Sequence, residues 1–426
     1  IGFTSMSIHP TYKASGIDWL GDIPEHWEVK RIINVSTIAN GSTPKSNVDK
    51  YWEGDITWVT PGDISKLNGY IFESERMITQ SGYESCGTVM VSKNSTVITC
   101  RAPIGNTVIA GKELCTNQGC KSLIPLKIEY RYLYYFILNA NEEIISLGQG
   151  TTFLELSRTS LGNTKISFPN SLTEQTAIAN YLAEKTNKLD QLIKNKKAQI
   201  AQLKEIRQIE INTAVTKGLD PNTKLKASGI EWLGDIPEHW EVKRIKNLSF
   251  LSGEKVFDYS DGDFLVALEN ITSWTGKLIK SDNSFEEGGI QFNSNSVLFG
   301  KLRPYLAKAY RPEKSGICVS EILSINCESW LNRDFLFYRL LSDAFIDVIN
   351  GSTFGAKMPR ANWLFISSLK MPLPSVQEQT AIANYLDEKT SKLDHLVNNL
   401  ENQIAQLQEV RKIEIFNAVT GKIKIV

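Results

Sequence analysis

The stretch EQTAIANYL at residues 174–182 occurs a second time, unchanged, at residues 378–386. The likeness continues downstream, because EKTNKLDQLIKNKKAQIAQLKEIRQIEINTAVT at residues 184–216 matches EKTSKLDHLVNNLENQIAQLQEVRKIEIFNAVT at residues 388–420. Residues 173–216 contain neither proline nor glycine, the two residues that most disfavour a helix interior. The sequence therefore predicts two long helices of related sequence.

Apolar side chains in both helices recur with steps of three and four residues, as in a coiled coil. They are Leu182, Leu189, Ile193, Ile200 and Leu203 in the first copy, and Leu386, Leu393, Val397, Leu400, Ile404 and Leu407 in the second. A helix of some 40 residues spans about 60 Å, which is too long for a compact domain. We therefore expect the two helices to pair with each other. The alternative is that each helix packs only on its own domain.

The connection after the first helix predicts the direction of pairing. KGLDPNTKLKAS at residues 217–228 interrupts the helix with glycine and proline, and the chain then enters a second domain whose helix must return. We expect antiparallel pairing in a pseudo-two-fold arrangement, with two domains separated by the coiled coil. Ser171 or Thr173 is the expected N-cap of the first helix, and Ser375 with Glu378 forms an expected capping box in the second.

A second repeated phrase precedes each domain. GIDWLGDIPEHWEVKRI at residues 16–32 returns as GIEWLGDIPEHWEVKRI at residues 229–245. The segments that follow differ, as in NGSTPKSNVDKYWEGDITWVTPGDI at residues 40–64 and SGEKVFDYSDGDFLVALENITSW at residues 252–274. Short apolar runs between Gly-, Asn-, Ser- and Thr-rich loops are typical of β-rich α/β domains. We predict a first domain at 1–172, a helix at 173–217, a linker and second domain at 218–374, and a helix with a tail at 375–426.

Composition limits the classes of function. Lys plus Arg and Asp plus Glu both number 47, whereas a free-standing nonspecific nucleic-acid binder is usually basic. Any DNA contact must therefore rest on local patches or on an assembly. The six cysteines lack CxxC spacing, which indicates reduced thiols in a cytoplasmic protein. The start of the chain does not resemble a signal peptide, and no apolar run is long enough for a membrane helix.

No catalytic motif is evident. The sequence has no Walker A motif, no GxGxxG after an expected strand and no Asn-Pro-Pro-aromatic signature. The four histidines are scattered without metal-ligand spacing. Asp22, Glu28 and Lys30, repeated as Asp235, Glu241 and Lys243, faintly resemble a nuclease pattern. Their close spacing across a proline argues against it, so we expect neither a catalytic residue nor a metal site.

Two different domains held by a long antiparallel pair of helices suit a linear target with approximate two-fold symmetry. Duplex DNA is the obvious candidate, because its major groove returns to the same face every ~34–36 Å. The alternative is a coiled-coil scaffold that presents two domains for ligands other than DNA.

The order of variable domain, repeated helix, variable domain and repeated helix resembles the DNA-specificity subunit of type I restriction-modification systems, which serve in host defence. The two GIxWLGDIPEHWEVKRI phrases, TPKSNVDKYWEGDITWVTPGDI at residues 43–64, RAPIGNTVI at residues 101–109 and the EQTAIANYL helix starts carry this resemblance. It covers residues 13–420.

The resemblance implies a non-catalytic subunit in which each variable domain is a target-recognition domain for one half of an asymmetric bipartite DNA site. It implies two methyltransferase subunits as partners, which bind S-adenosylmethionine, and restriction subunits that use ATP and Mg²⁺. This chain itself would hold no cofactor. The helices would set the spacing of the half-sites and dock the methyltransferase subunits.

Base readout and phosphate contact require polar and basic side chains on loops. In the first domain, the candidates are Lys45, Ser46, Thr60, Lys66, Arg101, Asn117, Gln118, Lys121, Thr151 and Thr152. In the second, they are Lys255, Tyr259, Asn270, Ser273, Lys277, Lys301, Arg303, Tyr305, Ser352, Thr353, Lys357 and Arg360. For each of them, an ordinary solvated loop position is the alternative.

The repeated phrases and helix starts carry apolar side chains that suit a partner used twice. The docking candidates are Trp19, Trp27, Tyr181, Leu182, Trp232, Trp240, Tyr385 and Leu386. The alternative is that these side chains attach each domain to the helix ends.

Overall fold

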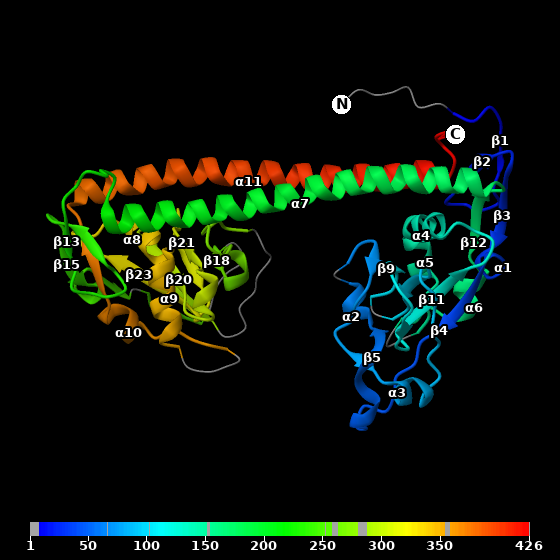
Figure 1. Ribbon diagram of the computed structural model, residues 1–426. Coiled ribbons are helices and arrows are strands. Elements are labelled where there is room, and N and C mark those ends of the chain that lie inside the picture. The colour runs from blue at the N-terminus through cyan, green and yellow to red at the C-terminus, as the bar shows by residue number, and fades with distance from the viewer. Residues whose placement is uncertain are drawn as a thin grey trace. The chain divides into compact units, whose positions relative to one another are not determined.

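The computed structural model describes residues 8–65, 67–101, 103–150, 154–251, 253–257, 263–279, 288–353 and 358–425 (Figure 1). The chain forms two compact units, and each is described by itself. Unit 1 comprises Ile1–Asn195 and Gln403–Val426, and unit 2 comprises Lys196–Asn402. Each unit thus contains one β-rich domain, the beginning of the long helix that follows it, and the end of the other long helix.

The two long helices have nearly the bounds that the sequence predicts. They are α7 (Leu172–Lys217) and α11 (Val376–Val419), labelled in Figure 1. The predicted apolar positions have uneven burial: Leu182, Ile193 and Leu386 are buried, and the remaining ones are half-buried. A pair of helices covers each seam from one side only, which accounts for the half-buried positions.

In unit 1, the beginning of α7 pairs with the end of α11. The Tyr181 hydroxyl donates to Glu414 at 2.7 Å, and Arg411 forms an ion pair with Asp190 at 3.1 Å. Because the later residue of α7 meets the earlier residue of α11, the helices run antiparallel here, as predicted.

The same contacts recur in unit 2 with the roles of the helices exchanged. The Tyr385 hydroxyl donates to Glu210 at 2.8 Å, and Arg207 donates to Asp394 at 2.8 Å. Each residue of this set lies 204 positions from its counterpart in unit 1. The antiparallel contacts are therefore written twice in the sequence, once for each unit.

The helix starts differ in one respect from the sequence prediction. The Ser375 hydroxyl accepts the backbone N–H of Glu378 at 3.2 Å, so the predicted N-cap is confirmed. The predicted capping box is wrong, because the Glu378 carboxylate accepts the indole N–H of Trp240 at 3.0 Å. At the start of α7, the backbone carbonyl of Ser171 accepts from Gln175 at 3.0 Å.

Unit 1 is built from four small sheets, with strand orders β1-β2, β12-β3, β4-β11-β8-β9-β6 and β10-β5-β7. Neighbouring strands are antiparallel except in the β6-β9 and β5-β10 pairs. The strands are β1 (Tyr12–Ala14), β2 (Asp22–Pro24), β3 (Trp27–Arg31), β4 (Ser36–Asn40), β5 (Trp52–Val59), β6 (Tyr70–Ile71), β7 (Met77–Ile78), β8 (Thr96–Thr99), β9 (Thr107–Ala110), β10 (Cys115–Thr116), β11 (Cys120–Pro125) and β12 (Lys165–Pro169). The helices before α7 are α1 (Ile32–Val35), η1 (Asp49–Tyr51), α2 (Pro61–Ile64), α3 (Gln80–Glu84), α4 (Tyr130–Asn139), α5 (Asn141–Ser146) and α6 (Arg158–Asn163).

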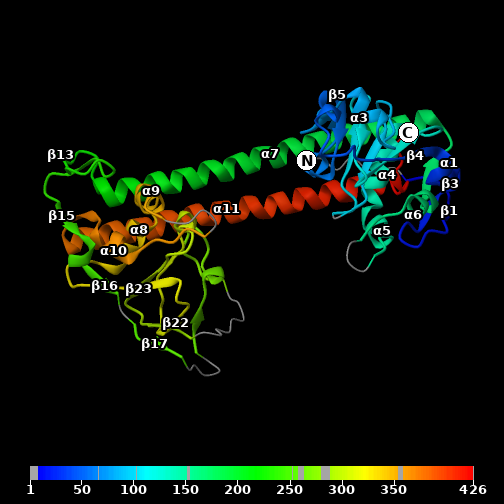
Figure 2. The ribbon, with the colours of Figure 1, turned by 90° about the horizontal axis from the view of Figure 1, so that it is seen from below.

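Unit 2 has the sheet orders β13-β14, β15-β24, β16-β23-β20-β21 and β17-β19-β22-β18. The strands are β13 (Leu225–Ala227), β14 (Asp235–Pro237), β15 (Glu241–Arg244), β16 (Ser249–Leu251), β17 (Lys255–Val256), β18 (Leu265–Val266), β19 (Gly289–Phe292), β20 (Ser296–Gly300), β21 (Ala309–Tyr310), β22 (Gly316–Cys318), β23 (Ile322–Cys327) and β24 (Lys370–Leu373). The helices are η2 (Ile245–Asn247), η3 (Leu268–Asn270), η4 (Pro304–Leu306), α8 (Arg333–Leu340), α9 (Asp343–Gly351) and α10 (Trp363–Ser368). The sheet that contains β23 lies nearer to α8 and α9 than the sheet with β17 and β22 (Figure 2).

The two domains share more architecture than their unlike sequences suggest. The order β4-β11-β8-β9 in unit 1 corresponds to β16-β23-β20-β21 in unit 2, with antiparallel pairing throughout. The second sheets differ, because β10-β5-β7 has no strand-by-strand match to β17-β19-β22-β18. A common four-stranded sheet therefore carries two different outer parts.

The main core of each unit needs the end of the other long helix. In unit 1, Ile415 and Val419 of α11 pack with Ile178 and Leu182 of α7 and with Tyr132 of α4. In unit 2, the corresponding cluster combines the end of α7 with the start of α11 and with α8. Neither core is complete from its contiguous segment alone.

Within the described ranges, no helix combines the length and the apolar character that are needed to cross a membrane.

Replacing Ile415 and Val419 by alanine should loosen unit 1. Both side chains are buried in its core, and each such truncation typically costs about 1–5 kcal/mol. Hydrogen–deuterium exchange should accelerate in α4 and remain unchanged in α8. Ile211→Ala with Val215→Ala is the matched change for unit 2 and should accelerate exchange in α8 instead. Faster exchange in α8 after the α11 change would contradict this assignment of the cores.

Candidate nucleic-acid interface

The repeated phrase attaches each domain to the first turn of its long helix. In unit 1, the indole N–H of Trp27 donates to Glu174 at 3.1 Å, and His26 contacts the same carboxylate at 3.0 Å. Trp27 is fully buried, so its N–H needs a partner inside the protein. Glu174 also lies at the positive end of the helix dipole, which favours its charge.

Unit 2 repeats this attachment. Trp240 donates to Glu378 at 3.0 Å, and His239 contacts the same carboxylate at 3.1 Å. A buried glutamine completes each joint: Gln175 accepts the backbone N–H of Glu129 at 2.8 Å, and Gln379 accepts that of Asn332 at 2.7 Å. The repeated phrase is therefore a structural joint between domain and helix. Attachment to the helix ends was the alternative to a docking role for its tryptophans.

The burial of the docking candidates divides them into two groups. Trp27, Leu182, Trp240 and Leu386 are at most 1% exposed, so their side chains are not available to a partner in this structure. Trp19, Tyr181, Trp232 and Tyr385 are half-buried. The prediction of a docking surface therefore rests on this second group.

The surroundings of Trp19 and Trp232 differ. Trp19 packs against Phe136 and lines a cavity of about 790 Å³ together with Asn141, Glu142 and Arg411. At the equivalent place in unit 2, the Arg339 guanidinium lies 4.9 Å from the Trp232 ring. Arg339 is fully buried, and this burial lowers its pKa to about 9. The two units therefore do not offer identical surfaces around this tryptophan.

In unit 1, several DNA candidates meet at one end of the sheets. The loop after β4 approaches the turn between β10 and β11, because the N–H of Ser42 donates to Thr116 at 2.9 Å. Two tryptophans hold this loop: Trp58 donates to the carbonyl of Ser42 at 2.9 Å, and Trp52 donates to that of Lys45 at 3.3 Å. The loop is thus held in place by hydrogen bonds from beneath.

The side chains at this end, which we call the unit 1 edge, are Lys45, Ser46, Thr60, Arg101, Asn117 and Gln118. Lys45, Ser46, Arg101 and Gln118 are exposed, and Thr60 and Asn117 are half-buried. The Cys100 N–H donates to Gly119 at 2.7 Å, which places Arg101 beside the turn that holds Asn117 and Gln118. The fold therefore gathers residues that are more than 70 positions apart in sequence.

Two candidates of unit 1 have internal partners. Thr60 forms a capping box with Asp63 at the start of α2. Lys121 is only 7% exposed and lies on β11 between β4 and β8, so a direct contact with DNA is not available to it in this structure. Lys66, Thr151 and Thr152 lie outside the described residues.

Arg101 is the principal cation of the unit 1 edge, and it has an acidic partner. Its guanidinium pairs with Glu155 at 3.0 Å, and both side chains are nearly half exposed. An exposed pair of this kind contributes little to stability. Arg101 can therefore exchange Glu155 for a phosphate or a base edge at small cost.

The corresponding loop of unit 2 follows β20 and carries Lys301, Arg303 and Tyr305; together with Arg360 from the segment before α10, these residues form what we call the unit 2 edge. A bridge between Leu302 and Arg360 joins it to the segment before α10, as the bridge between Arg101 and Glu155 joins the equivalent segments of unit 1. Arg360 pairs with Glu321 at 2.9 Å. Arg303 and Tyr305 are exposed.

Strained backbone is concentrated at this edge. Arg303, Ala307 and Trp274 have positive φ angles of 51°, 45° and 65°. This region of backbone conformation is unfavourable for residues other than glycine. Two of these residues contact each other, because Trp274 donates its N–H to Ala307 at 3.1 Å. Strain of this kind is frequent where the backbone has to present a functional side chain.

Other candidates of unit 2 serve mainly internal roles. Asn270 is 2% exposed and its side chain accepts the N–H of Ala267 at 2.6 Å, so it is not available to DNA in this structure. Lys277 pairs with Asp394 of α11 at 2.9 Å. The hydroxyls of Ser352 and Thr353 donate to carbonyls at the end of α9.

The remaining candidates of unit 2 have less defined surroundings. Lys255 is exposed on β17, and Ser273 is half-buried in the loop before Lys277. Tyr259 and Lys357 lie outside the described residues. Arg311, at the end of the basic strip that follows β20, faces inward and pairs with Asp387 of α11 at 2.7 Å.

The nuclease-like pattern has a structural explanation. Glu28 forms an ion pair with Lys30 on the same strand, and Glu241 pairs with Lys243 at 2.8 Å. The glutamates and lysines of this pattern thus bind each other. Burial raises the pKa values of five cysteine thiols, as expected of unreactive thiols. They are Cys100, Cys115, Cys120, Cys318 and Cys327.

The sequence positions of the four histidines suggested that they are scattered, but two of them lie close together in the structure. His9 and His26 converge on Glu174, with their potential ligand atoms all within 4.8 Å of one another. No spacing rule identifies this cluster, because its members come from three separate segments. Only the fold brings them together.

The chain was compared with families and individual proteins of known type. The model of the type I restriction modification DNA specificity domain matches residues 24–202 and again residues 237–406. The MjaIX specificity subunit of Methanocaldococcus jannaschii is 28% identical over 429 residues, which cover 95% of each chain. The EcoDI specificity subunit of Escherichia coli is 21% identical, with 95% of this chain and 90% of that protein covered.

A solved chain from a study of complex assembly and conformational transition in the type I R-M system has the same fold. Its TM-score is 0.65 at 14% identity, and the match covers 93% of this chain and 98% of that one. At this identity, the likeness concerns the fold alone.

The strain at Arg303 can be tested by substitution. Arg303→Gly should be more stable than Arg303→Ala by about 1 kcal/mol, because glycine adopts positive φ without the steric cost of a Cβ atom. Thermal or urea unfolding of the two variants measures the difference. At Lys301, which lies outside the positive-φ set, the alanine variant should be the more stable one. Equal ranking at both positions would show that the conformation of Arg303 carries no strain.

Proposed function

We propose, because this chain belongs to the family of type I restriction modification DNA specificity domains, that it selects the DNA target of a restriction-modification complex. Each unit would read one half of a bipartite, asymmetric target. Each of the two matches to the family model spans one domain and much of the long helix that follows it, in agreement with two reading modules in one chain. The relatives from Methanocaldococcus jannaschii and Escherichia coli are named specificity subunits, and the matches cover nearly their whole length.

One observation carries this proposal. The loops after β8 and β20 stand at equivalent places on the common four-stranded sheet, and each forms an exposed edge with arginine. The unit 1 edge adds the amides of Asn117 and Gln118, whereas the unit 2 edge adds Lys301 and Tyr305. Arginine suits guanine and phosphate, and amide side chains suit adenine. Equivalent positions with different side chains fit two readers of different half-sites.

Charge supports a division of labour between base and phosphate contacts. The chain has equal numbers of acidic and basic residues, so nonspecific attraction to the phosphate backbone is weak. We propose that Lys45, Arg101, Lys301, Arg303 and Arg360 supply local contacts to DNA. Subunits bound to this chain would then provide much of the remaining affinity.

The proposed partners are two methyltransferase subunits and, through them, restriction subunits. The half-buried Trp19 and Trp232, with Tyr181 and Tyr385, remain the candidate docking residues, since these positions occur once in each unit. S-Adenosylmethionine would be bound by the methyltransferase subunits, and ATP and Mg²⁺ by the restriction subunits. We propose that this chain is non-catalytic and contributes target recognition.

The long helices would set the number of unread base pairs between the half-sites. Each is a single helix, of 46 residues in α7 and 44 in α11. Paired antiparallel helices are stiff, in contrast to a Gly/Ser linker. The rival idea of a scaffold for other ligands has no observation in its favour.

Exchange of one domain should change one half of the target. When residues 34–172 are replaced by the corresponding segment of a relative with a different target, the methylated motif should keep one half and acquire a new other half. Mapping of methylated bases in cells that contain the complete complex measures this. A chain-deleted strain is the control and should lose the motif. Unchanged methylation in both strains would refute the proposed function.

A longer helix pair should widen the gap between the half-sites. Seven residues inserted within residues 194–204 of α7, and seven at residues 398–408 of α11, preserve the heptad spacing. They lengthen the pair by about 10 Å, which is about three base pairs. The same methylation mapping should show unchanged half-sites with a wider gap. Altered half-sites with the original gap would count against a spacing role.

A further inference from the structure

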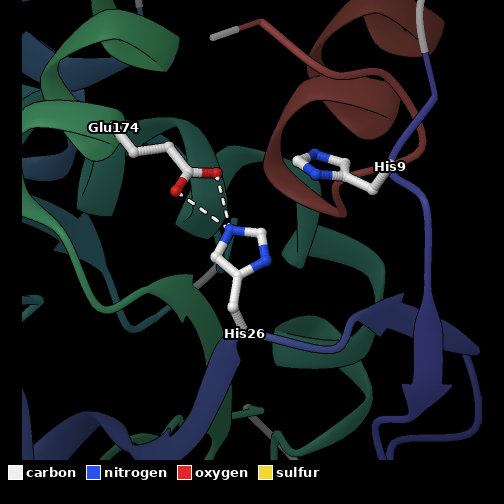
Figure 3. Close-up of side chains that lie close together, drawn as sticks. All are labelled: His9, His26 and Glu174. Atoms are coloured by element: carbon white, nitrogen blue, oxygen red, sulfur yellow. Dashed lines mark hydrogen bonds and ion pairs between the residues drawn. The ribbon is translucent and has the colours of Figure 1, made fainter.

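Three ligand-type side chains of unit 1 converge from separate segments. His9 precedes β1, His26 lies in the turn between β2 and β3, and Glu174 lies in the first turn of α7. Figure 3 shows the two imidazole rings and the carboxylate close together, with His26 directed at both oxygens of Glu174. The potential ligand atoms of the three residues lie within 4.8 Å of one another.

The distances and the residue types suit a transition-metal ion. Two histidines and one glutamate form a known ligand set for zinc, with a fourth position left for water. Ligands at about 2.0–2.2 Å from zinc in tetrahedral geometry lie about 3.4 Å apart. The Nε2 atom of His26 and the Oε2 atom of Glu174 are already 3.0 Å apart. A modest rotation of His9 therefore completes the site.

His9 is placed as a ligand and not as a surface residue. His9 is 5% exposed, and its ring packs edge-on against Trp27 with ring centroids 6.3 Å apart. Its backbone N–H donates to the Tyr12 hydroxyl at 3.3 Å, and that hydroxyl donates to Gly421. Among the described residues, neither ring nitrogen has a hydrogen-bond partner. Because no described protein group binds these nitrogens, one of them is available to a metal ion.

The carboxylate already has the outer support that metal ligands usually have. The Trp27 indole donates to Glu174 at 3.1 Å and holds its orientation, as outer groups do in metal sites. The Oε2 oxygen of Glu174 contacts only His26 among the described residues, so it retains a lone pair for a metal ion. Lys424 lies near the cluster, and its positive charge disfavours a bound cation. Glu174 offsets this charge.

Unit 2 offers an internal comparison, because it has the joint without the third ligand. His239 contacts Glu378 at 3.1 Å and Trp240 donates to the same carboxylate. At the position of His9, 213 residues later, the second copy has Asn222. The His–Glu contact is thus common to both joints, and His9 is specific to unit 1.

We propose that His9, His26 and Glu174 bind one divalent transition-metal ion of the zinc type. The ion would join the segment before β1 to the β2–β3 turn and to the start of α7. It would therefore stabilise the joint of unit 1 and have no counterpart in unit 2. This inference concerns the joint and is independent of the function proposed for the edges.

Zinc binding to the full chain tests the proposal. Protein without a histidine tag is stripped with a chelator, dialysed against Zn²⁺ and analysed for metal content and melting temperature. The wild-type chain should bind one zinc per chain at this site and melt at a higher temperature with zinc. His9→Asn, which copies the second joint, should bind at least tenfold more weakly and lose the zinc-dependent shift. His239→Asn is the matched control and should behave as wild type.

A second variant distinguishes direct ligation from a structural effect. His9→Cys supplies a thiolate in place of an imidazole, and Co²⁺ bound there should show sulfur-to-cobalt charge-transfer absorption that the wild-type site lacks. Equal zinc affinity of wild type and His9→Asn, or no zinc bound by the wild type, would overturn the proposal. So would a cobalt-loaded His9→Cys chain without the thiolate absorption. In those cases the cluster is a hydrogen-bonded joint only.

Discussion

The hydrogen bond from a buried indole to a glutamate at a helix start is the constraint on which the rest of the structure depends. Trp27 with Glu174, and Trp240 with Glu378, place a charged acceptor beside the otherwise unpaired N–H of a core side chain. The same glutamates lie where the helix dipole favours negative charge. One contact thus satisfies a buried donor, orients the domain and fixes the start of the helix. The long helices begin at the domains for this reason.

Each unit is completed by a segment from far along the chain. Tyr181 and Glu414 are 233 positions apart, yet their hydrogen bond belongs to unit 1. The ends of the long helices are therefore core elements of one unit and, at the same time, the continuation of the other. Both cores therefore contain residues of the second long helix. This arrangement explains why the repeat preserves both the beginning and the end of the helix so closely.

The long helices were readable from the sequence, and attachment of the domains to the helix ends was one of two interpretations of the repeated phrase; only part of the site was readable. Repetition and the spacing of three and four residues predicted the helices, and the local pattern at the helix start predicted the role of Ser375. The linker at residues 217–228 predicted the antiparallel pairing. Exposed Arg101, Arg303 and Gln118 and half-buried Asn117 were found among the loop candidates. Lys121, Asn270 and Lys277 looked equally suitable, yet they have internal partners or burial that no one-dimensional pattern reports. Polar type indicates capacity for contact, whereas burial decides which contact is made.

The sequence by itself determined the twofold plan of this protein: two related helices, two related joints and two unlike domains. Its family membership follows from the same motifs. Tertiary structure alone decided that Glu378 accepts from Trp240 and does not close a capping box, because an indole from 138 positions away competes for the carboxylate. It alone brought His9 and His26 to Glu174. Contacts between distant segments depend on how strands and helices pack, and packing has no signature in local spacing.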